Sequence, residues 1–116
     1  MDMLKVLGNN IAYLRGVTGL SQQDLSSYLK INRVELSYYE NGQRSIPMTK
    51  LRMLADLVGI EPMSLYDESF AKRPLQTAFA FRSNGFEVSD LETIADFQRI
   101  ARNYLRFKRL SENLSN

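Results

Sequence analysis

The side chains that most often carry out catalysis are missing from this chain of 116 residues, which contains no histidine and no cysteine. These absences exclude a His-based triad, a thiol nucleophile, a disulfide and a zinc site of the usual Cys/His kind. The chain also lacks a glycine-rich loop of the kind that cradles phosphates. We therefore expect no enzyme activity, no metal site and no cofactor.

Side chains suited to binding nucleic acid are present, and they concentrate in one stretch. Residues 21–52 hold five Lys or Arg and three Asp or Glu, whereas residues 1–68 as a whole hold seven bases and eight acids. Residues 69–116 hold eight bases and five acids. The net charge of +2 and the pI of about 9.0 by themselves give only weak support for a nucleic-acid partner.

The overall composition is that of a globular protein, with 44% hydrophobic and 24% charged residues. No apolar run approaches the ~20 residues that a membrane span needs. The N-terminal MDMLKVLGNN has no signal-peptide core. We expect a cytoplasmic protein with no membrane partner.

Five short helices are expected in the first part of the chain. Apolar residues recur there every three or four positions, which is typical of helices with one buried face. Capping and helix-breaking residues predict where these helices begin and end: Gly19, Ser21, Asn32, Asn41-Gly42, Pro47, Gly59 and Pro62. The pattern predicts one all-α domain over residues 1–68.

Residues 69–116 have a different pattern. Two sets of residues alternate there with the period of two that is typical of a strand: Leu75, Thr77, Phe79 and Phe81 in one set, and Gln76, Ala78, Ala80 and Arg82 in the other. Ser89 is then placed to cap a long helix from about Asp90 to Leu110. We expect a short β-strand followed by a long C-terminal helix.

One stretch, GLSQQDLSSYLKINRVELSYYENGQRSIP, resembles the helix-turn-helix of the Cro/phage-repressor (XRE) family of bacterial DNA-binding proteins. The resemblance extends from about Leu4 to Leu65, and Lys30 stands where the family usually has the glycine of the turn. It implies a mainly α fold, in which a five-helix lambda-repressor-like DNA-binding domain precedes the strand and the long helix. The matching residues are Gly19, Leu20, Ser21, Gln22, Leu25, Leu29, Ile31, Arg33, Leu36, Ser37, Tyr39, Glu40, Gly42, Arg44, Leu51 and Ala55.

The resemblance also implies roles for single residues. An arginine at the start of the recognition helix can pair with guanine, and a valine can meet a thymine methyl group. The residues expected to read bases are Arg33, Val34, Ser37 and Tyr38, and those expected to position phosphates are Ser21, Gln22, Asn41, Gln43 and Arg44. In the family pattern, Arg15 and Glu40 form a structural ion pair. Glu35 either accepts a hydrogen bond from cytosine or caps Asn32.

The C-terminal segment predicts a dimer, because an isolated strand needs the edge of another strand and the helix has two apolar stripes. The alternative is that strand and helix fold back on their own domain. The residues expected at the dimer interface are Thr77, Phe79, Phe81, Leu91, Ile94, Phe97, Ile100, Ala101, Tyr104, Leu105 and Phe107. A basic run, Arg99 to Arg109, either contacts DNA or an acidic partner or forms a solvated helix face.

These observations favour a sequence-specific transcriptional regulator that binds double-stranded DNA, most simply a repressor acting as a homodimer on a palindromic operator. A short helical chain with no ligand domain suggests that any effector is another protein or a cleavage event. The alternative function is that of an antitoxin or regulatory interaction protein, whose C-terminal segment binds a toxin or a peptidase.

Overall fold

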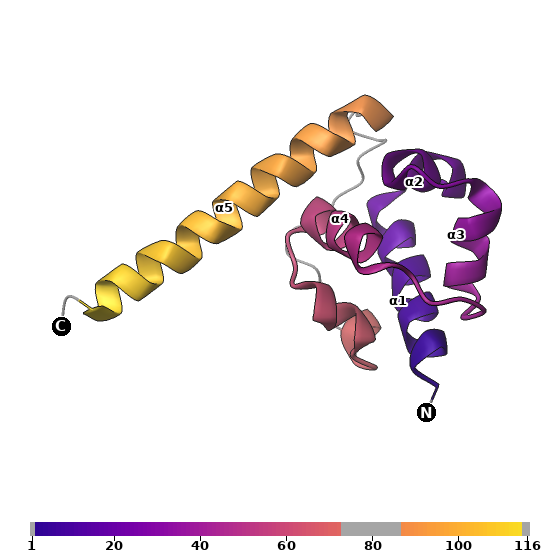
Figure 1. Cartoon of the computed structure of the whole chain (residues 1–116), viewed down its shortest axis with the longest axis horizontal. Helices are drawn as coiled ribbons and strands as arrows, with labels where there is room; N and C mark the ends of the chain where they lie inside the picture. Colours follow the sequence, from indigo (N-terminus) through magenta and orange to yellow (C-terminus); the bar gives the residue numbers. More distant parts are fainter. Residues whose placement is uncertain (1, 73–86, 115–116) are drawn as a thin grey trace.

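The computed structural model describes residues 2–72 and 87–114. Within these ranges the chain forms five α-helices and two short 3₁₀-helices, arranged as a rounded body from which the last helix projects (Figure 1). The elements in chain order are α1 (Met3–Thr18), α2 (Gln22–Leu29), α3 (Arg33–Glu40), α4 (Met48–Val58), η1 (Pro62–Tyr66), η2 (Phe70–Lys72) and α5 (Val88–Leu114).

Local capping explains why the short helices begin and end where they do. The Ser21 hydroxyl accepts a hydrogen bond from the backbone N–H of Asp24, whose carboxylate accepts one from the Ser21 N–H, so that the two form a capping box. The Asn32 side chain caps α3 in a similar way. Lys30 ends α2 with φ 60°, a left-handed conformation that costs a residue with a Cβ about 1 kcal/mol.

The core lies where α1, α2, α3, α4 and η1 meet. Leucines with no more than 1% exposure come from each of these elements, for example Leu7 on α1, Leu36 on α3 and Leu54 on α4. The core continues past the predicted domain boundary at residue 68, because Phe70 is buried with its ring edge-on to Tyr13 at 6.0 Å. Local spacing therefore produces helices whose apolar faces converge on one centre.

The fold class expected from the sequence is wrong, because it includes a short β-strand. Residues 2–72 and 87–114 contain helices and no strand, and residues 75–81, for which the strand was expected, lie outside these ranges. The alternating pattern was weak support, because a strand is stable only when its backbone groups are paired, and the described part of the chain offers no strand to pair with. The described fold is all-α, and α1 to α4 with η1 are the five short helices that the sequence predicts.

The long C-terminal helix is attached to the body from its first turn as far as Arg106, which pairs with Glu61. α5 packs against α4 and α2, and its Leu91 and Ala95 are buried in the same core as the other helices. Beyond these contacts, its C-terminal part extends away from the body into solvent (Figure 1). None of the helices in the described ranges is long and apolar enough to cross a membrane.

Candidate nucleic-acid interface

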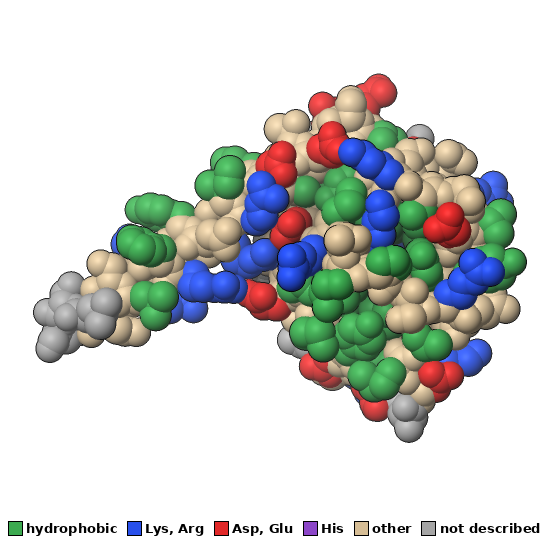
Figure 2. Space-filling view, viewed as in Figure 1, with side chains coloured by type: hydrophobic (Ala, Val, Ile, Leu, Met, Phe, Trp, Pro, Cys, Tyr) green, Lys and Arg blue, Asp and Glu red, His purple; other side chains and the backbone are tan. Residues whose placement is uncertain are grey.

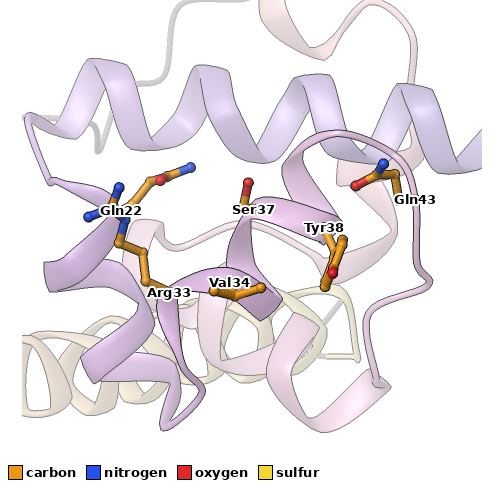
Figure 3. A pocket seen from close by; sticks show the side chains of 6 residues that line it. All are labelled: Gln22, Arg33, Val34, Ser37, Tyr38 and Gln43. Carbon is orange, nitrogen blue, oxygen red and sulfur yellow. The ribbon is translucent and has the colours of Figure 1, made fainter.

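The outward side of α3 forms a shallow surface bordered by two other segments. Six polar and apolar side chains line it, with Gln22 from the start of α2 at one end and Gln43 from the loop after α3 at the other (Figure 3). The residues between them, all on α3, are Arg33, Val34, Ser37 and Tyr38. The structure thus brings together the four residues expected to read bases and two of those expected to position phosphates.

The two sides of α3 have different tasks because the helix repeats every 3.6 residues. Leu36 and Tyr39 point into the core and are buried. Arg33 and Val34, in contrast, lie in the first turn and are exposed, Val34 by 60%. The core contacts hold the helix in place and leave its first turn accessible, which is the geometry needed for a helix that enters the major groove.

Loop residues after α3 border the same surface. The guanidinium of Arg44 lies over the ring of Tyr38, 4.4 Å from its centre, in a cation–π contact. The side-chain amide of Asn41 donates to the hydroxyl of Ser37 at 3.3 Å. These contacts place a cation and an amide at one edge of α3.

An ion pair joins α1 to α3 beneath this surface. The Nε of Arg15 donates to one oxygen of Glu40 at 2.7 Å, and an Nη donates to the other at 3.1 Å. The Arg15 side chain is 25% exposed and that of Glu40 only 6%. A second Nη of Arg15 donates to the carbonyl of Leu20, so the same arginine also fixes the turn before α2.

Sequence reasoning missed a third member of this pair. The side-chain amide of Gln22 donates to Glu40 at 3.1 Å, so one carboxylate holds both the arginine beneath the surface and a glutamine that lines it. No signal in the sequence points to this contact, because Gln22 and Glu40 are 18 residues apart on different helices. Gln23, also missed, lines a neighbouring hollow together with Arg15, Ser21, Gln22 and Arg33.

Other side chains near the surface are occupied by local contacts. The Ser21 hydroxyl caps α2. The backbone N–H of Glu35 donates to Asn32, and the amide of Asn32 donates to the carboxylate of Glu35 at 3.3 Å. Of the two roles considered for Glu35, the structure shows the capping contact.

Two buried tyrosines stay protonated at neutral pH. Burial raises the pKa of Tyr39, the nearby Glu35 raises it further, and Arg44 opposes the shift. Burial also raises the pKa of Tyr28, and Asp56 adds to the effect. The protonated Tyr28 hydroxyl donates to the carbonyl of Met53 at 2.6 Å, which links α2 to α4. In the described ranges, no group of carboxylates gathers in a way that could hold a metal ion.

The residues expected at a dimer interface fall into three groups. Thr77, Phe79 and Phe81 lie outside the described residues. Leu91 is buried against the chain's own body, Ile94 packs at the edge of that core, and Ala101 is half-buried. The remaining side chains, 54 to 73% exposed, are Phe97, Ile100, Tyr104, Leu105 and Phe107.

Comparison with known proteins agrees with this geometry. A helix-turn-helix family model matches residues 4–65. An uncharacterized HTH-type transcriptional regulator of Sinorhizobium fredii (strain NBRC 101917 / NGR234), y4dJ, is 34% identical over 65 residues, which cover 56% of this chain and 84% of the relative. No solved structure matches the chain. The chain belongs to the XRE-type helix-turn-helix family of DNA-binding transcriptional regulators.

Proposed function

We propose that this protein is a sequence-specific transcriptional repressor that binds a palindromic operator as a homodimer. The observation that carries the DNA-binding part is the outward surface of α3, on which an arginine and an apolar side chain are exposed in the first turn between two glutamines. Such a helix fits the major groove, and residues of its first turn reach base edges. A small protein bound over an operator blocks access to that stretch of DNA, which is the reason for proposing repression.

The proposed readout assigns separate tasks to the centre and the edges of this surface. Arg33 pairs with a guanine, and Val34 packs against a thymine methyl group. Gln22 and Gln43 meet phosphates on the two sides of the groove, and Arg44, held over Tyr38, adds a positive charge on the side of Gln43. α5 contributes no side chain to the lining of this surface.

Replacing Arg33 tests this assignment. We expect Arg33→Ala to weaken specific binding by about 1–3 kcal/mol and to relax the preference at one base pair in each half-site. The measurement is fluorescence anisotropy with the operator found by footprinting around the protein's own gene, and with variants of it substituted at single positions. Arg52→Ala, which removes an exposed arginine from α4, is the matched control.

The two possible results differ in their salt dependence. The loss of a base contact changes the preference at one base pair of each half-site. It leaves the slope of log affinity against log salt concentration nearly unchanged. If Arg33→Ala instead lowered affinity equally for all sequences and reduced the slope by about one unit, Arg33 would be a phosphate contact.

The homodimer is proposed from the outer side of α5. Phe97, Ile100, Tyr104 and Phe107, called here the far face, follow one another at intervals of three, four and three residues, the spacing of a coiled-coil seam. On a helix these four lie opposite Leu91 and Ala95, which pack on the body. Figure 2 shows hydrophobic side chains at the surface along the projecting half of α5.

The size of the far face suits a second copy of the chain. Its four side chains, 63 to 73% exposed, present roughly 600 Å² of mainly apolar surface, and a standard interface buries about 800 Å² per partner. The arginines of the helix fall outside the seam, so that pairing two far faces does not oppose their charges. A dimer also presents two recognition helices, which a specific operator needs because one helix reads only a few base pairs.

Sedimentation equilibrium tests the dimer. We expect the full chain at tens of micromolar to have the mass of two copies, and the Ile100→Ser, Phe107→Ser variant to have the mass of one. Leu105→Ser, an apolar side chain on the same helix but outside the far face, is the control and should remain dimeric. A monomeric parent chain would make the far face a docking surface for another protein instead.

A further inference from the structure

Within the described residues, α5 has two largely buried attachments to the body, besides the exposed ion pairs of Arg106 with Glu61 and of Glu92 with Lys30. The first is the apolar contact of Leu91 and Ala95 with the core. The second is Arg102, seven residues later, whose two Nη atoms donate to the carbonyl of Ile60 at 2.7 Å and to the carboxylate of Asp56 at 2.9 Å. The two attachments lie about 10 Å apart along the helix. Together they oppose a pivoting of α5 relative to the body, which either attachment alone would allow.

The contact of Arg102 with Asp56 and Ile60 restricts the movement of α5 relative to α4. The side chains of Arg102 and Asp56 are only 22% and 17% exposed, so that water screens the pair less than it screens a surface pair. Both acceptors lie at the C-terminal end of α4, where the helix dipole favours a cation. The planar guanidinium bridges two acceptors at once, which a single ammonium group cannot do in the same geometry.

Arg102 also lies level with the far face. The far face spans residues 97–107, and Arg102 is near the middle of that span on the opposite side of the helix. The same three turns of α5 therefore contact the body on one side and, in the proposed dimer, the second copy on the other. Any change in the angle at Arg102 moves the whole body, with its recognition helix, relative to the dimer seam.

We propose that Arg102 and Asp56 are positioning residues that set the spacing of the two half-sites in the operator. The proposal rests on the proposed homodimer. Neither residue lines the surface that meets DNA, and both act by fixing the angle between α5 and the DNA-binding helices. One base pair moves a half-site by about 3.4 Å along the duplex and turns it by about 35° around the axis, so a body that can pivot at Arg102 reaches the neighbouring register through a change of that size.

The test compares operators that differ only in the distance between half-sites. Affinity is measured for the native operator and for operators with one base pair inserted or removed at the centre. The parent chain should lose about 100-fold in affinity on the altered operators, because only one half-site can then be engaged. Arg102→Met should lose less than about 10-fold, because the Arg106–Glu61 pair that remains is exposed and weak, and the two bodies can adjust to the new spacing.

Three controls separate this effect from a loss of structure. Arg109→Met makes the same substitution on an exposed part of the same helix and should keep the discrimination of the parent. Affinity for a DNA fragment with one half-site should be equal in all variants, and circular dichroism should show equal helix content. Asp56→Asn removes the charge from the other partner, so it should reduce the discrimination in the same direction even if Arg102→Met fails to fold.

The outcomes for this proposal and for the proposed function are distinct. If the chain is a dimer but its Arg102→Met and Asp56→Asn variants discriminate between half-site spacings as strongly as the parent, the proposed role of Arg102 is wrong. A parent dimer that binds all spacings equally also overturns it. A monomeric parent, or one with no preference for any DNA sequence, overturns the proposed function itself.

Discussion

Gly8→Ala is expected to lower the free energy of unfolding by about 3 kcal/mol or more. A Cβ at this position would lie 2.6 Å from the carbonyl oxygens of both Tyr39 and Glu40. These atoms belong to the backbone at the end of α3, so no side-chain rotation can relieve the overlap. α1 and α3 would have to separate, and the contacts between these two helices and the Arg15–Glu40 pair would be strained.

Gly16→Ala on the same helix is the matched control. No atom lies within 4 Å of a Cβ placed there, apart from the immediate surroundings on the helix itself. Alanine is the better helix former, so we expect stability to rise by about 0.5–1 kcal/mol. Urea denaturation followed by circular dichroism compares the two variants, and equal midpoints for both would contradict the close approach of α1 to α3.

Arg15→Ala is expected to destabilise the fold by about 3 kcal/mol, near the lower end of the range for a broken buried pair. Among the described residues, it leaves the Glu40 carboxylate, 6% exposed, with the amide of Gln22 as its one remaining side-chain hydrogen-bond donor. Glu40→Ala should cost less, about 1–2 kcal/mol, because Arg15 is 25% exposed and water can reach its guanidinium. The order of the two effects follows from this difference in burial.

A double variant distinguishes a lost attraction from an uncompensated charge. Arg15→Met combined with Glu40→Leu removes both charges and keeps much of the volume, so it should recover a large part of the stability lost in the single variants. The measurement is the free energy of unfolding in urea for all variants. Single variants that both melt like the parent would show that the pair adds nothing to stability.

The parts of the fold that sequence alone predicts are those determined by neighbouring residues. Ser21 and Asn32 cap their helices through contacts three residues away, and Gly19 ends α1 through its own left-handed conformation. The face of α3 also follows from its sequence, because the helical repeat places Leu36 inside and Val34 outside. Such features need no knowledge of the rest of the chain.

Features that depend on distant parts of the chain could be predicted only where the family resemblance supplied them, as it did for the Arg15–Glu40 pair. The bond between Gln22 and Glu40 requires the relative position of two helices, and Phe70 fills a space beside Tyr13 that only the folded body defines. The sequence shows two apolar stripes on the last helix without indicating which one packs on the body. The structure distinguishes them: Leu91 is buried, whereas Phe97 is exposed.

Because one side of α3 is exposed and the other is buried, the DNA sequence that the protein binds can be changed separately from its fold. Arg33 and Val34 are exposed and make no contact on which the core depends, whereas the neighbouring Leu36 holds the helix in place. New side chains at the two exposed positions can therefore be combined freely in a library, with little effect on folding. Selecting variants from such a library would yield domains that bind other DNA sequences while the core residues stay unchanged.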